Sequence, residues 1–83
     1  MPETDEIKVY PNPTNSILNI ELPQNYKTEN TELEILDVNG RTFLQKKLIS
    51  VFMQIDISKL NSGLYSVKIQ NRKTLITKKI IIQ

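Results

Sequence analysis

The chain has 83 residues and a mass of 9.6 kDa, which is enough for one small domain and excludes a two-domain enzyme. It contains no cysteine and no histidine, so disulfides, thiolate metal sites and the commonest general base are excluded. Isoleucine and leucine dominate its apolar residues and alanine is absent, a composition that favours strands over helices.

The net charge of +2 conceals a division along the chain. Residues 1–42 carry eight acidic and three basic side chains, whereas residues 43–83 carry eight basic side chains and one acidic. Such a division is typical either of a phosphate-binding surface or of acidic and basic strands that lie side by side. We expect the second, and no nucleic-acid partner, because the basic half lacks interleaved aromatic residues and any nucleic-acid-binding motif.

The amino-terminal segment predicts a linker followed by a short strand. Residues 1–8 begin with an acidic, polar leader, and we expect them to join residues 9–83, the domain itself, to an upstream cargo. The strand ends at Tyr10, since Pro11 and Pro13 on either side of Asn12 remove two backbone donors. This proline segment either ends the strand and protects a sheet edge or serves as a recognition element, and its residue types favour the first role.

Four segments alternate apolar and polar residues with the period of a half-buried strand. They are Ile17–Leu22, Thr31–Leu36, Met53–Ile57 and Leu64–Gln70, with inward positions at Leu18, Ile20, Leu22, Leu33, Ile35, Met53, Ile55, Ile57, Tyr65, Val67 and Ile69. Pro23 ends the first of them, and a polar loop over 24–30 follows, anchored by Tyr26. Between Leu44 and Phe52 the alternation blurs, and strand, bulge and irregular connection all remain open.

Two turns carry stronger local information. Asn39-Gly40 between strand-like segments predicts a hairpin with a type I′ turn, which needs a positive φ at both residues. Calcium binding by Asp37 and Asn39 is rejected, because a calcium loop needs more oxygen ligands and a distal glutamate.

The second turn is the polar corner from Ser58 to Gly63, which includes Leu60 and in which Gly63 supplies a backbone angle that other residues resist. Tyr65 follows directly, and its position fits a tyrosine corner, in which the hydroxyl binds upstream backbone.

The last predicted strand, residues 74–82, has apolar residues on both faces, and we expect it to be covered on both sides for part of its length. Lys78 and Lys79 point to opposite faces, so at least one should reach solvent. They serve either a translocon or protease contact or protection of a strand edge against aggregation.

These elements predict an all-β fold, an immunoglobulin-like antiparallel β-sandwich of about seven strands. We expect no catalytic residues, no metal and no cofactor: Ser58 and Lys59 are adjacent and point apart, and 83 residues hardly provide a cleft. A non-catalytic accessory module that binds carbohydrate or a partner protein is an alternative function. Pairing of partly guarded sheet edges would give a homodimer.

Several segments together resemble one family, the type A C-terminal sorting domain of the type IX secretion system of Bacteroidota. The resemblance covers residues 9–83, in the order of the family's motifs. It is carried by residues 9–13 with the strand after them, residues 35–41, residues 56–67 and residues 78–82. One departure is the last hairpin turn, where members often have glycine and this chain has Asn71-Arg72-Lys73.

The resemblance implies a sorting signal at the carboxyl end of a larger secreted protein. Its implied partners are the upstream cargo, an outer-membrane translocon and a sortase-like surface protease that cleaves upstream of Val9. The implied location is outside the cell or on the surface of a Gram-negative bacterium, reached through the periplasm and outer membrane. The residues expected to act in recognition or in the fold are Tyr10, Pro11, Asn12, Pro13, Asn39, Gly40, Leu60, Gly63, Tyr65, Lys78 and Lys79.

Overall fold

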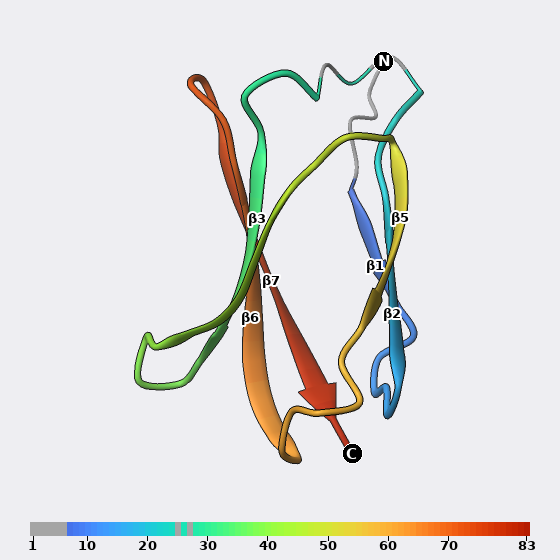
Figure 1. Ribbon diagram of the computed structural model, residues 1–83, viewed down its shortest axis with the longest axis vertical. Coiled ribbons are helices and arrows are strands. Elements are labelled where there is room, and N and C mark those ends of the chain that lie inside the picture. Colours follow the sequence, from blue (N-terminus) through green and yellow to red (C-terminus); the bar gives the residue numbers. More distant parts are fainter. Residues whose placement is uncertain (1–6, 25, 27) are drawn as a thin grey trace.

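The structure is a computed structural model that describes residues 7–24, 26 and 28–83; the acidic leader and part of the loop expected over 24–30 lie outside the described residues. Over that part of the chain it has seven strands and no helix, which confirms the all-β prediction (Figure 1). The strands are β1 (Lys8–Tyr10), β2 (Ile17–Glu21), β3 (Glu32–Asp37), β4 (Thr42–Lys47), β5 (Phe52–Asp56), β6 (Gly63–Gln70) and β7 (Leu75–Ile82).

Two antiparallel sheets form the layers of the sandwich. One has the order β1-β2-β5 and the other the order β4-β3-β6-β7. The chain crosses between the layers after β2, β4 and β5, and β1 and β7 run in the same direction along the long axis (Figure 1). The β-sandwich predicted from the spacing of alternating segments is confirmed.

The core lies between the two sheets and is built from the apolar face of each strand. Its buried residues are Ile7, Leu18, Ile20, Leu22, Leu33, Ile35, Leu48, Ile55, Ile57, Tyr65, Val67, Ile69, Ile80 and Ile82. Each such side chain contributes about 1.5–3 kcal/mol by leaving water, so burial of one face fixes which strands form and which way they face. All predicted inward positions are buried except Met53, which is half-buried against the core.

The hairpin between β3 and β4 is confirmed, but the predicted type I′ turn is wrong. Gly40 has a φ of 84°, whereas Asn39 has no positive φ. The Gly40 N–H donates to the Asp37 carbonyl and the Asp37 N–H to the Arg41 carbonyl, both at 3.0 Å, so one glycine in the left-handed region closes a three-residue loop. The Asp37 carboxylate also accepts the N–H groups of Asn39 and Arg41 at 2.9 Å, which holds the loop without a positive φ at Asn39.

The blurred pattern between Leu44 and Phe52 has a structural cause. The β4 strand lies at a sheet edge, where most of its side chains are exposed on both faces, and the β3–β4 register shifts between Ile35 and Leu36. After β4 the chain crosses to the other sheet, with Leu48 buried on the way. An exposed edge strand followed by a crossing segment has no reason to alternate.

The expectation that the last strand is covered on both faces is wrong. In β7, Ile80 and Ile82 are buried against the other sheet, whereas Leu75 is 59% and Ile81 47% exposed on the outer face. A two-layer sandwich covers each sheet on one side only, and no third layer forms within the described part of the chain.

The turn before β7 needs no glycine. The Asn71 side-chain oxygen accepts the N–H groups of Lys73 and Thr74 at 2.8 Å, and no residue of this turn has a positive φ. The Asn71 N–H also donates to the Thr74 carbonyl at 3.0 Å, so the departure from the family pattern is accommodated by an asparagine side chain that adds to the backbone pairing of the turn.

Acidic and basic strands do lie side by side, as expected from the division of charge. The acidic strand β3 pairs with β4 on one side and β6 on the other, which places Glu32 opposite Lys47. Across the β3–β6 pair, Lys68 Nζ lies 3.2 Å from a Glu34 carboxylate oxygen.

Candidate recognition site

The segment from Pro11 to Thr14 docks on the outer edge of β7. The Asn12 side-chain oxygen accepts the N–H of Ile81 at 2.9 Å, and its amide nitrogen donates to the Lys79 carbonyl at 3.3 Å. The Thr14 N–H then donates to the Ile81 carbonyl at 2.9 Å, and the Gln83 N–H donates to the Thr14 carbonyl at 2.8 Å. Residues almost seventy positions apart thus form one surface.

The asparagine side chain takes the place of a peptide group in this contact, because it offers one acceptor and one donor to the edge of a strand. Thr14 continues the pairing as a parallel bridge to Ile82 and is only 3% exposed. The proline segment therefore ends β1 and covers the carboxyl-terminal part of the β7 edge.

Tyr10 is the last residue of β1 and is partly exposed on the outer face of the three-stranded sheet. Its hydroxyl donates to Glu21 Oε1 at 3.2 Å. Partial burial, followed by the hydrogen bond to Glu21 and its negative charge, raises the pKa of Tyr10. Phe52 is also exposed on this face, across Glu21, whereas Tyr26 packs against the core and accepts a hydrogen bond from the Asn71 amide at 3.1 Å.

The corner between β5 and β6 contains three of the expected residues. Leu60 is half-buried against the core, and its N–H donates to the Ile57 carbonyl at 3.0 Å. Gly63 has a φ of 153°, an angle that side chains disfavour. The Tyr65 hydroxyl donates to the Asn61 carbonyl at 2.7 Å, so the predicted tyrosine corner is confirmed.

Two residues that the sequence analysis did not single out join this corner to the β3–β4 hairpin. The ring of Phe43 meets that of Tyr65 edge to face, with centroids 5.9 Å apart, and the Arg41 guanidinium lies 5.7 Å from the Phe43 centroid. Arg41 Nε is also 3.3 Å from an Asp37 carboxylate oxygen. Phe43 lies where the β3–β4 register shifts, so no alternation could have revealed its direction.

The Asp37 carboxylate accepts three hydrogen bonds, from the Asn39 N–H, the Arg41 N–H and the Arg41 side chain. The hydrogen bond from the Arg41 backbone, outweighing partial burial, lowers the pKa of Asp37, and the bond from the Asn39 backbone and the Arg41 side chain act in the same direction. The carboxylate is therefore a turn-stabilising group.

Lys78 and Lys79 occupy opposite faces of β7, as their adjacency predicts. Lys79 is exposed on the outer face, opposite Ser66, and Lys78 is half-buried on the inner face, opposite Val67. Within residues 7–24, 26 and 28–83 neither lysine forms an ion pair.

Most of the expected residues gather at one end of the sandwich. The β1–β2 loop, the β5–β6 corner and the end of β7 meet there (Figure 1), because Gly63 pairs with Ile82 and the Ile57 N–H donates to the Ser16 carbonyl at 2.8 Å. The hairpin with Asn39 and Gly40 reaches the same end through the pairing of Asp37 with Tyr65 in the adjacent strand. Lys78 lies four residues before the end of β7 and therefore away from this end of the sandwich.

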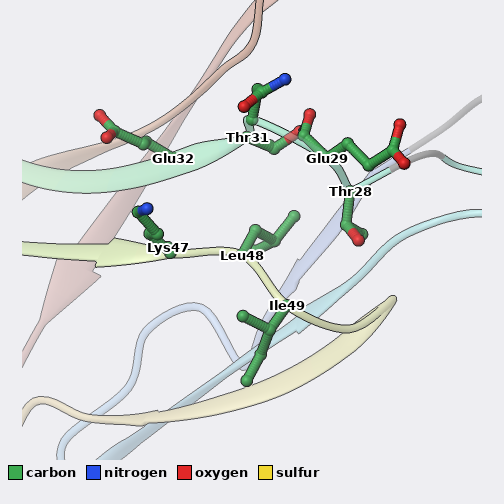
Figure 2. A pocket seen from close by; sticks show the side chains of 8 residues that line it. Thr28, Glu29, Thr31, Glu32, Lys47, Leu48 and Ile49 are labelled. Atoms are coloured by element: carbon green, nitrogen blue, oxygen red, sulfur yellow. The ribbon is translucent and has the colours of Figure 1, made fainter.

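Two of the surface hollows bear on this end, one close to it and one at the opposite end of the sandwich. One, of about 410 Å³, lies on the outer face of the four-stranded sheet and is lined in part by Gly40, Leu64 and Lys79. Another, of about 440 Å³, lies at the opposite end, between the segment before β3 and the end of β4 (Figure 2). Figure 2 shows the side chains of Glu29, Lys47 and Ile49 around it, and none of the expected residues lines this second hollow.

The described residues were compared with the requirements of a metal cluster and of a membrane-spanning helix. No group of three metal-binding side chains comes together among them. They also include no helix of the length and apolarity needed to cross a bilayer.

Comparison with known proteins identifies the family. A family model described as the secretion system C-terminal sorting domain matches residues 8–83. The chain belongs to this family. It therefore carries a C-terminal sorting signal for type IX secretion, which implies contact with the type IX machinery and delivery to the cell surface or the medium. The family is one of sorting signals and not of enzymes.

A solved structure supports the fold of this sorting domain. The chain is similar to part of PorZ from Porphyromonas gingivalis, described as an essential bacterial surface component of the type IX secretion system. The TM-score is 0.70 at 21% sequence identity, over 95% of this chain and 12% of the PorZ chain. The sorting domain thus spans about an eighth of that protein. No curated protein matches the chain.

Proposed function

We propose that the sorting domain is the last domain of a larger cargo and that the outer-membrane translocon recognises it in its folded form. Residues 9–83 form the domain, and residues 1–8 are the linker to the cargo. The surface offered is the end of the sandwich that carries Asn12, Tyr65 and the end of β7, and the remaining expected residues except Lys78 shape it.

One observation carries this proposal, the hydrogen bonding of the Pro11–Thr14 segment to the last residues of β7. These segments come from opposite ends of the chain, and both contain residues expected to act in recognition. A receptor that contacts this surface would meet both segments at once and would bind the folded chain in preference to the unfolded one.

Later steps follow from the same proposal. A sortase-like surface protease removes the domain by cleavage upstream of Val9, after passage through the periplasm and the outer membrane. The domain supplies no catalytic residue and needs no cofactor. Edge pairing between two copies would form a homodimer, which light scattering at increasing salt concentration would detect.

The test fuses residues 1–83 to a reporter in a host with a type IX system. We compare the intact fusion with one that lacks residues 78–83, with Asn12→Ala, and with Asn15→Ala as a control in the same exposed loop. We expect surface delivery of the intact and Asn15→Ala fusions only. Equal delivery of the intact and truncated fusions, or delivery of neither, would contradict the proposal.

A further inference from the structure

The outer edge of β7 carries backbone groups that point away from the sheet. In an antiparallel pair, alternate residues direct their N–H and C=O groups toward the partner strand and away from it. Both groups of Ile81 point outward, because they bind Asn12 and Thr14. The same parity applies to Lys79, Thr77 and Leu75, which lie two, four and six positions before Ile81.

These outward groups differ in whether they already have a partner. The Asn12 amide binds the Lys79 carbonyl, and Ile81 is fully paired. Within the described part of the chain, no backbone pairing is made outward by the N–H of Lys79 or by Thr77 and Leu75. The first part of the β7 edge therefore remains open, and the docked proline segment marks where it ends.

This edge is also more regular than the other edge of the same sheet. β7 pairs with β6 through eight consecutive residues without a register shift, whereas the pairing of β4 with β3 is interrupted between Ile35 and Leu36. A regular edge can accept another strand, while a bulge twists an edge away from pairing.

The lysines of β7 determine what kind of strand fits. Lys78 points to the inner face and Lys79 to the outer face, so a strand beside them meets an ammonium group on each side of the pleat. An apolar or basic strand would cover the Lys78 ammonium without compensation, which disfavours it. A strand with carboxylates opposite these positions would form charge-assisted hydrogen bonds instead.

We propose that the edge of β7 from Leu75 to Lys79 binds an extended acidic segment of a type IX partner protein by strand addition. This inference rests on the proposed function and names the chemistry of the partner. Backbone hydrogen bonds to Thr77 and Lys79 provide the attachment, and the two lysines select carboxylates on opposite faces of the added strand.

The test uses residues 1–83 labelled with ¹⁵N and two blocked synthetic valine hexapeptides, one with Glu at the two central positions and one with Lys there, because adjacent residues of a strand point to opposite faces. We expect the Glu peptide to shift the amide signals of Thr77 and Lys79 and the Lys peptide to leave them unchanged. Thr77→Pro removes one outward N–H without removing a β6–β7 hydrogen bond, and we expect roughly tenfold weaker binding from it. Thr77→Val keeps the N–H and is the matched control.

Several results would overturn this inference. They are unshifted amides with the Glu peptide, equal shifts with both peptides, equal binding by the two Thr77 variants, or shifts that follow protein concentration without peptide, which would indicate a second copy. The same variants in the reporter fusion separate this inference from the proposed function. If the intact fusion is delivered and Thr77→Pro is delivered equally well, the edge is not used, whereas failure of the intact fusion contradicts the sorting proposal itself.

Discussion

The tyrosine corner offers the clearest test of how the β5–β6 connection is held. Tyr65→Phe removes only the hydroxyl that donates to the Asn61 carbonyl at 2.7 Å, and leaves the buried ring and its contact with Phe43 in place. A net hydrogen bond contributes about 0.5–1.5 kcal/mol, and an acceptor left buried without a partner costs more. Asn61 is exposed, so water can reach its carbonyl in the variant.

We therefore expect Tyr65→Phe to lower the free energy of unfolding by about 1 kcal/mol, the middle of the range for a hydrogen bond whose acceptor becomes hydrated. For a domain of this size, that corresponds to a fall in Tm of about 4–8 °C. Urea unfolding followed by circular dichroism should show a lower midpoint with an unchanged m-value, because the surface exposed on unfolding is the same.

Tyr10→Phe is the matched control, since it removes an exposed hydroxyl whose bond to Glu21 is 3.2 Å long. We expect it to change the free energy of unfolding by less than about 0.5 kcal/mol. Equal effects of the two substitutions would show that the Tyr65 hydroxyl does not hold the corner, and the assignment of a tyrosine corner would then be wrong.

Three further predictions concern the proline segment, the hairpin turn and its carboxylate. Asn12→Ala should make the Ile81 amide exchange with deuterium roughly tenfold faster, and Asn12→Asp, which keeps the acceptor, should do so less; unchanged exchange in both would contradict the contact. Gly40→Ala should cost about 1 kcal/mol in thermal unfolding and Gly40→Asn less, because asparagine tolerates a positive φ; the reverse order would refute this turn geometry. Because the folded-state pKa of Asp37 lies below its ordinary value of 3.8, the stability that this group provides is present above that value and is lost as pH falls through the folded pKa. Asp37→Asn should remove that part of the acid dependence, and a ¹³C titration of the carboxylate that gave an ordinary pKa would contradict the assignment.

Strand positions could be predicted from the sequence because burial of one face leaves a period of two. Leu18, Ile20 and Leu22 show it clearly, as do Val67 and Ile69, and all of them are buried. The same rule failed for β7, because apolar residues occupy both faces there and only one face is covered. Composition alone does not distinguish an apolar residue in the core from one on an outer face.

The docking of Asn12 on β7 had no comparable sequence pattern. It depends on one side chain that hydrogen-bonds to backbone groups of Lys79 and Ile81. These backbone groups are the same in almost every residue, so the sequence does not mark which residues the side chain will contact. The turn type at Gly40 was likewise set by the Asp37 side chain and the adjacent register shift. Contacts made by single side chains across long sequence separations require the three-dimensional arrangement.

The common direction of β1 and β7 has a consequence for where a cargo, a receptor and a protease would approach the domain. β1 begins toward the end of the sandwich opposite the carboxyl terminus, on a body whose longest extent is 36 Å (Figure 1). Under the proposed function, a large cargo would therefore not cover the end that the receptor binds, and cleavage ahead of Val9 could take place while the receptor remains bound. Receptor binding and proteolytic cleavage would then use opposite ends of the domain.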